Sequence, residues 1–265
     1  MSKDLVQKQF GAHAAAYATS RVHAKGASLN RVVEVVAPQK TWRALDIATG
    51  AGHTALAFAP HVAHVIASDL TDEMLTEARK LTREKGLGNV ETARADAEDL
   101  PFDDAAFDLV TSRIAPHHFP DPARFVREVA RVLRPGGTFA LIDNIAPDSV
   151  STPGFSDAEL SEAAAAYNAF EKLRDPSHAR CLGMKEWSAL MEAAGLSVRH
   201  QERLPKDMEF DPWAVRLGCD APTVERLRAM LLGATPALTA FLKPRTADGE
   251  LWFTLDEAII VAQKA

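Results

Sequence analysis

The residues best suited to ligand chemistry lie in a short stretch, 43–52, which reads RALDIATGAG. Its apolar positions predict a buried strand with Asp46 near its carboxyl end. A turn with Gly50 and Gly52 follows, before a helix-prone run at 53–58. Backbone amides at a helix start can approach a polar ligand closely, and glycine suits positions where a Cβ would clash or a positive φ is needed. The stretch therefore predicts a ligand cradle, although a glycine turn that serves packing alone has the same pattern.

A second acid, Asp69, ends the apolar run 62–69. An acid about 20 residues beyond a glycine turn, at the tip of the neighbouring strand, can accept hydrogen bonds from a ribose diol. Dinucleotides and adenosyl ligands share this diol, and GAGHTA (50–55) also fits the dinucleotide fingerprint. An ionised Asp46 before the turn would sit badly beside a pyrophosphate but well beside the ammonium group of an amino acid. These charges favour S-adenosylmethionine over NAD.

Four strings follow one another over residues 40–145: LDIATGAGHTA, SDLTDEML, ADAEDLPFDDAAFDLV and RVLRPGG. Together they resemble the class I S-adenosylmethionine-dependent methyltransferases, most closely the small-molecule branch that includes the ubiquinone and menaquinone biosynthesis methyltransferases (methyltransferase type 11). The resemblance implies transfer of a methyl group from S-adenosylmethionine to a small-molecule acceptor, with S-adenosylhomocysteine as product. One departure is Ala48, where the family often has glycine, and it bears on the geometry of the loop.

The resemblance also assigns roles around the cofactor. Asp96 would accept a hydrogen bond from the adenine amino group, and the Ala97 amide would donate to a ring nitrogen. Met74 would lie against the adenine, unless it is an ordinary core methionine. The predicted cofactor-binding residues are Asp46, Ala48, Thr49, Gly50, Gly52, Asp69, Leu70, Met74, Asp96, Ala97, Ser112, Arg113 and Tyr17.

Helices are predicted near 3–16 and 27–37. In the resembled family, N-terminal helices often cover the cofactor. We therefore expect Phe10 and Tyr17 to contact ligand, with docking of the helices on the sheet as the alternative for both residues.

Three histidines are candidates for a general base, because an imidazole titrates near neutral pH. His117 and His118 lie in TSRIAPHHFPD (111–121), at the expected ligand edge of the sheet. We expect one of them, His117 ahead of His118, to line the site; the alternative is one structural and one solvent-facing histidine. No carboxylate spacing accompanies the pair, so no metal is expected. His178 is the third candidate.

An insertion at 148–183 breaks the strand–helix alternation, and in this family such an insertion usually forms the cap on the acceptor side. It carries a polar cluster, RDPSHAR (174–180), which would bind an anionic or hydroxylated acceptor; helix capping and surface charge are the alternative. The expected acceptor-binding residues are Phe10, Asp143, Arg174 and Arg180.

Strands and helices alternate between residues 43 and 144, which predicts a parallel sheet with helices on both faces. With the resemblance, the expected fold is α/β: a Rossmann-like, doubly wound, mostly parallel seven-stranded sheet with an antiparallel last strand and a helical cap. We expect a single domain, 1–265, with its core at about 40–147 and 184–265 and its cap from 1–38 and 148–183. The predicted strands are 43–47, 63–68, 90–94, 107–112, 137–143, 196–204 and 251–264, the last being a closing strand or hairpin.

Composition narrows the function classes further. A net charge of −6 argues against a nucleic-acid partner held by phosphate neutralisation. Two cysteines without metal-ligand spacing fit a reducing compartment. No run approaches the ~18 apolar residues of a membrane helix, and the start has no signal core, so we expect a cytoplasmic protein. A non-catalytic or altered-reaction relative and an NAD-dependent oxidoreductase stay open as alternatives, and so do the methylated atom and the oligomeric state.

Overall fold

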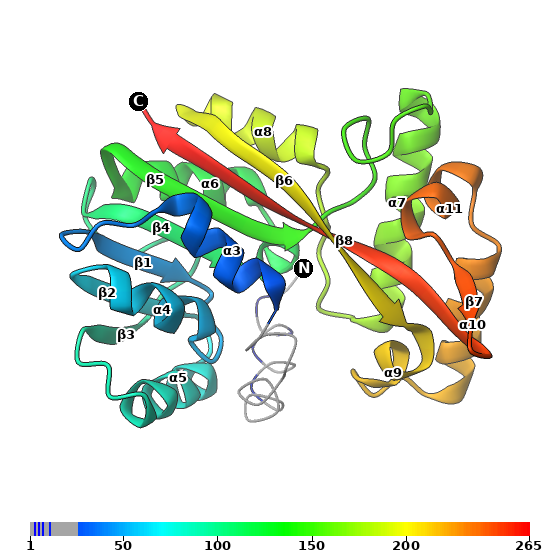
Figure 1. Cartoon of the computed structure of the whole chain (residues 1–265), viewed down its shortest axis with the longest axis horizontal. Helices are drawn as coiled ribbons and strands as arrows, with labels where there is room; N and C mark the ends of the chain where they lie inside the picture. The colour runs from blue at the N-terminus through cyan, green and yellow to red at the C-terminus, as the bar shows by residue number, and fades with distance from the viewer. Residues whose placement is uncertain (1–2, 4, 6, 8–10, 12–25) are drawn as a thin grey trace.

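The computed structural model describes residues 3, 5, 7, 11 and 26–265 (Figure 1). Phe10 and Tyr17, both predicted to contact ligand, lie outside the described residues. Within the described part of the chain, no helix is long and apolar enough to cross a membrane.

One sheet organises the chain, with strand order β3-β2-β1-β4-β5-β8-β6. The first five strands run parallel, whereas β8 is antiparallel to both of its neighbours, β5 and β6. A short β7 pairs with β8 and makes the predicted closing hairpin. The mostly parallel fold with an antiparallel last strand is therefore confirmed. The strands are β1 (Arg43–Ile47), β2 (His64–Asp69), β3 (Val90–Arg94), β4 (Phe107–Arg113), β5 (Leu133–Asn144), β6 (Leu196–Glu209), β7 (Arg245–Ala247) and β8 (Glu250–Lys264).

The two faces of the sheet carry different helices, because side chains alternate along each strand. In β1, Ala44 packs with α3 and α4, while Leu45 and Ile47 belong to the core formed with α6 and α8. The chain order reverses between β1 and β4, and ligands bind such sheets at the carboxyl edge of this switch point. The helices bounding this region are α3 (Ala27–Val36), α4 (His53–Phe58), α5 (Asp72–Glu84), α6 (Pro122–Val132) and α8 (Met184–Ala193).

Strands β6 and β8 continue beyond the sheet as a two-stranded ribbon, which crosses to the second group of helices (Figure 1). β5 pairs with β8 only as far as Asn144 and Glu257, whereas β6 pairs with β8 on to Glu209 and Trp252. The ribbon makes β6 longer than the predicted strand 196–204. The helices around it are α7 (Asp157–Arg174), α9 (Phe210–Val215), α10 (Ala221–Leu232) and α11 (Pro236–Leu242).

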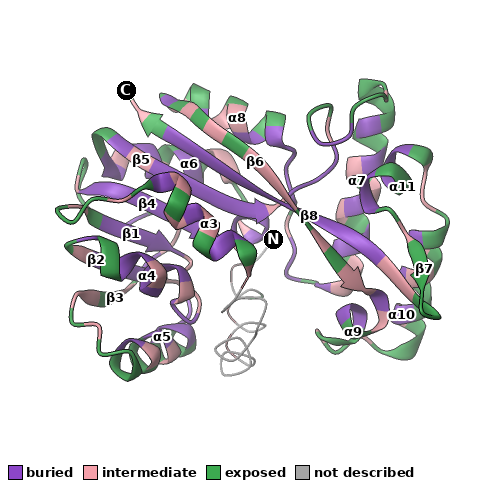
Figure 2. Ribbon diagram, in the orientation of Figure 1, coloured by how far each residue is buried: buried purple, intermediate pink, exposed green. Residues whose placement is uncertain are grey.

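Aromatic packing joins these helices to the ribbon. Trp213 on α9 stacks on Phe170 of α7, with ring centroids 5.0 Å apart, and meets Phe253 of β8 edge-on at 4.9 Å. All three residues are buried. Figure 2 shows further buried positions along β8. α10 and α11 also pack against α7. Residues 210–242, which the sequence pattern assigns to the core, therefore lie beside the 148–183 insertion.

Helix α7 begins with a capping box, which fixes where the insertion becomes helical. The Ser156 hydroxyl accepts a hydrogen bond from the Glu159 amide, and the Glu159 carboxylate accepts one from the Ser156 amide. Such reciprocal capping satisfies two amides that a helix start leaves unpaired. It sets the register in which α7 presents Asn168 and Glu171 to the histidine region.

The turn between β1 and α4 predicts unequal effects of alanine at its two glycines. Gly52 has φ +91°, and an added Cβ would lie 3.2 Å from the Cβ of Ala78, whereas Gly50 has φ +55° with nothing within 4 Å. Gly52→Ala should lower the free energy of unfolding by about 1–3 kcal/mol, measured by urea denaturation. Gly50→Ala is the matched control and should cost less. Equal losses in the two variants would contradict this geometry.

Candidate active site

The carboxylate of Asp46 lies beneath the glycine turn and is buried, with only 2% of the residue exposed. Its Oδ2 accepts hydrogen bonds from the Thr49 hydroxyl at 2.6 Å and from the Ala55 amide at 3.1 Å. Its Oδ1 accepts one from the Thr111 hydroxyl at 2.6 Å. These donors come from the turn, from α4 and from β4, so a single side chain fixes the turn relative to both neighbouring elements.

This position changes the role assigned to Asp46. Burial raises its pKa to about 6, against the opposing effect of the hydrogen bonds from Thr111, Thr49 and Ala55. Asp46 is also absent from the cavity wall described below. Its carboxylate accepts hydrogen bonds from donors of the chain itself, so it supports the cradle from below.

A cavity lies over the carboxyl ends of the parallel strands; together with the open solvent at its mouth it encloses about 1030 Å³. The turn after β1, the tips of β2 and β3 and the segment after β4 form its wall. The residues around it are Lys3, Ala48, Thr49, Gly50, Ala51, His53, Thr54, Asp69, Leu70, Thr71, Met74, Ala95, Asp96, Ala97, Glu98, Arg113, Ile114, Ala115, His118, Phe119 and Pro120.

Most residues assigned to the cofactor from the sequence meet on this wall. Besides Asp46, two assigned residues in the described part of the chain do not. Gly52 is the N-cap of α4 and faces Ala78 of α5. Ser112 is fully buried, and its hydroxyl donates to the Ile47 carbonyl at 3.0 Å. Both residues contact neighbouring elements and not the cavity, so they support the turn on the side away from the cavity.

Ala48 occupies the position where the resembled family often has glycine. Its φ is +52°, in the left-handed region that disfavours residues with a Cβ. The turn thus keeps the backbone conformation that glycine would allow, and the alanine methyl group adds to the cavity wall.

Asp69 stands on the opposite side of the turn. Its Oδ2 accepts from the Gly50 amide and its Oδ1 from the Thr71 amide, both at 2.9 Å. Burial raises the pKa of Asp69, and these amide hydrogen bonds oppose the shift. A carboxylate oxygen has more than one lone pair, so Asp69 can accept further hydrogen bonds from hydroxyl groups of a ligand in the cavity.

At the far end of the cavity, Asp96 is bound by two donors. Its Oδ1 accepts from the Glu98 amide at 3.0 Å, and its Oδ2 forms an ion pair with the Lys3 ammonium at 2.5 Å. Lys3 also reaches the Glu98 carboxylate at 2.7 Å. Sequence reasoning missed Lys3 and Glu98, since their function depends on a contact between segments more than 90 residues apart.

Arg113 places a buried cation on the cavity wall. Its Nε donates to the Ser28 hydroxyl at 3.2 Å. Burial lowers the pKa of Arg113, while the nearby carboxylates of Glu257 and Asp46 raise it. A guanidinium remains protonated even when burial lowers its pKa. Arg113 can therefore pair with a ligand carboxylate.

Ile114 was also missed from the sequence. It follows β4 on the cavity wall with φ +52°, which is rare for a β-branched residue. Its amide donates to the Ile142 carbonyl at 2.8 Å. This contact turns the chain from β4 toward the histidines, and no residue type in the sequence signals it.

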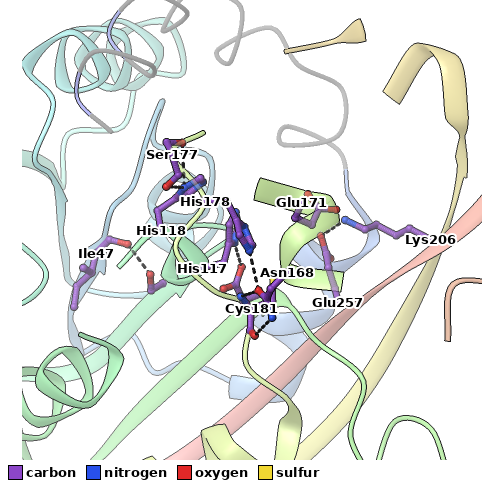
Figure 3. A network of polar contacts seen from close by, with 12 residues as sticks. Ile47, His117, His118, Asn168, Glu171, Ser177, His178, Cys181, Lys206 and Glu257 are labelled. Carbon is purple, nitrogen blue, oxygen red and sulfur yellow. Dashed lines mark hydrogen bonds and ion pairs between the residues drawn. The ribbon is translucent and has the colours of Figure 1, made fainter. Parts of the chain in front are cut away.

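The three candidate histidines come together in a polar cluster beside the sheet (Figure 3). The His117 ring lies 4.2 Å from that of His118 and 5.7 Å from that of His178, measured between centroids. His117 Nδ1 contacts Asp143 Oδ1 at 2.6 Å. Burial lowers the pKa of His117, but the nearby carboxylates, Asp143 first among them, raise it above its ordinary value overall. His117 is therefore the histidine that favours the charged form.

Of the three candidate histidines, His118 is the one that reaches the cavity. Its Nδ1 lies 3.0 Å from the Ser177 carbonyl oxygen, which can only accept, so Nδ1 carries the proton and Nε2 is the basic nitrogen. Burial and the charge of His117 lower the pKa of His118 to about 3. The cavity thus has a neutral imidazole at the end of β4, whereas the sequence favoured His117 for this position.

His178 is not on the cavity wall, and its ring is hydrogen-bonded within the cap. Asn168 donates through Nδ2 to the Ala164 and Cys181 carbonyls, which identifies Oδ1 as its acceptor. His178 Nε2 donates to this Oδ1 at 2.9 Å, and the Cys181 amide donates to the same atom at 2.7 Å. Burial lowers the pKa of His178 to about 2. Its hydrogen bond ties the 175–181 loop to α7.

The residues assigned to the acceptor are scattered. Arg174 forms an ion pair with Glu171 at 3.1 Å and lies over the Trp213 ring at 4.3 Å, inside the cap. Arg180 is exposed and pairs with Glu186. Asp143 is bound to His117. None of these side chains is on the cavity wall.

The wall fits an adenosyl amino acid. Asp69 and Asp96 offer acceptors for hydroxyl and amino groups, and Arg113 offers a cation for a carboxylate. At Gly50 the chain leaves the space beside the turn open, with nothing within 4 Å of a notional Cβ. These groups span the cavity from the tip of β3 to the end of β4.

Comparison with known proteins decides the family. A family model described as a methyltransferase domain matches residues 45–141. The uncharacterized methyltransferase YcgJ of Bacillus subtilis is 39% identical over 212 residues, which cover 80% of this chain and 79% of YcgJ. The chain belongs to the S-adenosylmethionine-dependent methyltransferases. Its cofactor is accordingly S-adenosylmethionine.

Further comparisons show how much of this methyltransferase is shared with similar proteins. The crystal structure of YcgJ aligns with a TM-score of 0.81 at 35% identity, covering 89% of this chain and 97% of that one. The uncharacterized protein YafE of Escherichia coli is 32% identical over 216 residues, or 81% of this chain and 97% of YafE. The demethylmenaquinone methyltransferase of Clavibacter sepedonicus is 40% identical over 112 residues, but these cover only 42% of this chain and 45% of that enzyme.

Because the Asp46 carboxyl group is buried, we expect the free energy of unfolding to depend on pH. Its folded pKa of about 6 exceeds the ordinary 3.8, so the folded protein holds a proton that the unfolded chain has lost. The unfolding free energy of the wild type, minus that of D46N, should therefore fall as pH rises from about 4 to about 6, by about 3 kcal/mol in total. Urea denaturation across this range measures it. A difference that does not vary with pH would contradict the assignment.

Proposed function

We propose that this methyltransferase acts on a small-molecule acceptor whose reacting atom gives up a proton, as in a phenol, an enol or a carbon acid. One observation carries the proposal: His118 presents a neutral imidazole to the cavity, with its Nδ1 proton donated to the Ser177 carbonyl. Nε2 is then the atom that takes the acceptor's proton.

The cofactor would be held along the cavity by the residues that line it. The Asp69 carboxylate would accept from the ribose hydroxyls, and Asp96 from the adenine amino group, with the Ala97 amide donating to the ring. The buried Met74 side chain would lie against the adenine. Arg113 would pair with the carboxylate of the amino-acid end.

S-adenosylmethionine, when bound, supplies a methyl group already activated by the positive sulfonium. In the proposed reaction the acceptor atom forms a bond to this methyl carbon in line, and the electron pair of the broken carbon–sulfur bond stays on sulfur. The acceptor's proton passes to Nε2 of His118. The chain contributes mainly by positioning the two reactants and excluding water.

The charges of the site support His118 in this role. Sulfur loses its positive charge in the same reaction that charges the imidazole, so the total charge of the site stays constant. A cationic His118 beside a sulfonium would be repelled by it. Burial and the charge of His117 lower the pKa of His118, so its imidazole is neutral before the acceptor binds.

We propose that the acceptor is held by the cap formed by the 148–183 insertion, within a single domain. The loop of that insertion lies directly against the histidines: the Ala179 and Arg180 amides donate to the His117 carbonyl at 2.9 and 3.0 Å. The cap therefore lies against the segment that carries His118, which supports the proposal that the acceptor reaches His118 from this side.

Calorimetric titration tests the cofactor placement. S-adenosylhomocysteine should bind the wild type, while NAD⁺ should not. Asp69→Ala should weaken S-adenosylhomocysteine by about 1.5–3 kcal/mol, through lost hydrogen bonds to a charged acceptor. Asp103→Ala, which removes an exposed acid outside the cavity, is the control. Binding of NAD⁺ alone, or unchanged affinity in Asp69→Ala, would count against the placement.

Turnover assays test the base. Formation of S-adenosylhomocysteine is followed over a panel of phenols, hydroquinones and 1,3-dicarbonyl compounds. With a responsive acceptor, His118→Ala should lower turnover by about 10²–10⁴-fold and leave S-adenosylhomocysteine affinity intact. His178→Ala should chiefly reduce thermal stability, because it loses the hydrogen bond to Asn168. If His118→Ala retains full turnover, the assignment of the base is wrong.

A further inference from the structure

Lys3 lies at the adenine end of the cavity and belongs to its wall. Its ammonium group is 2.5 Å from Asp96 Oδ2 and 2.7 Å from Glu98 Oε2. The other oxygen of Asp96 already accepts from the Glu98 amide. The ammonium group therefore occupies cavity space next to the oxygen that is available to a ligand.

Two further described residues near the start of the chain follow the same rim. The Gln7 side-chain amide donates to the Leu70 carbonyl at 2.9 Å. A Cβ added to Gly11 would lie 3.3 Å from Glu73 Oε2 on α5. Lys3, Gln7 and Gly11 thus meet successive points of one edge, which places Lys3 at Asp96 through more than a single ion pair.

Glu98 gives Lys3 a second site. Glu98 is 5% exposed, and its Oε1 accepts from the Asp121 amide, which anchors the carboxylate independently of Lys3. If a ligand takes Asp96, the ammonium group keeps its ion pair with Glu98. Displacement of Lys3 from Asp96 therefore costs one ion pair and leaves the other.

We propose that Lys3 determines the purine specificity of the cavity by competing with the adenine amino group for Asp96. The inference rests on the proposed placement of adenine at Asp96. An amino group on the purine donates to the carboxylate in place of the ammonium group. A 6-oxo purine has no such donor, so it leaves Lys3 on Asp96 and can accept a hydrogen bond from the ammonium group.

The test compares two ligands in calorimetry: S-adenosylhomocysteine and its 6-oxo analogue, S-inosylhomocysteine. Lys3→Met removes the charge and keeps the apolar stem. It should tighten S-adenosylhomocysteine about two- to fivefold, the range for a partly exposed ion pair, and should not tighten the 6-oxo analogue. The ratio of the two affinities therefore rises. Lys80→Met is the matched control, since Lys80 is an exposed lysine of α5 that lies near Glu77; it should change neither affinity.

Each other result has a distinct meaning. Weaker S-adenosylhomocysteine binding in Lys3→Met would show that the lysine holds the bound cofactor instead of competing with it, and equal changes for both ligands would remove its role in specificity. Either would overturn the proposal. Failure of the wild type to bind S-adenosylhomocysteine at all would instead overturn the cofactor placement on which the proposal rests.

Discussion

The site depends on one buried interaction, the acceptance of three hydrogen bonds by the Asp46 carboxylate. Burying a carboxylate is costly unless its oxygens are satisfied. Here the donors come from the turn, from the first turn of α4 and from β4, so the same contacts that compensate the burial also fix three elements relative to β1. Asp69 binds the Gly50 amide from the other side. The turn is thereby held between two carboxylates, which leaves little freedom in the cradle.

Charge is distributed unevenly among the histidines, and the distribution suits methyl transfer from a sulfonium. Against the effect of burial, Asp143 at 2.6 Å raises the pKa of His117, deep beside the sheet. His118, its neighbour in the chain, is neutral and reaches the cavity. A positive ligand can therefore approach His118 without repulsion from that ring, while the Asp143 carboxylate compensates charge on His117. This pairing separates a histidine bound to a buried carboxylate from one that reaches the cavity.

The assembly of the cap could not be predicted from local sequence patterns. The strands near 196 and 251 were predictable from the sequence pattern. Their assembly was not. β6 and β8 extend past β5 because they pair with each other, and the ribbon is stabilised by rings from three distant segments, Phe170, Trp213 and Phe253. No local pattern reports a contact between residues 40 or more positions apart.

The sequence by itself determined the alternation of strands and helices, the glycine turn and the acids at the strand tips. Each of these follows from local spacing, and parallel strands necessarily bring their carboxyl ends to one edge. Only the tertiary structure decided what the individual side chains do. Asp46 supports the turn because Thr111 of another strand lies within reach of its carboxylate. His117 and His118 differ because Asp143 and the Ser177 carbonyl, far away in the chain, bind one ring each. Arg174 is engaged by Glu171 and Trp213 inside the cap. A residue's type and spacing limit its chemistry, but the partners that set its charge and direction are supplied by the fold.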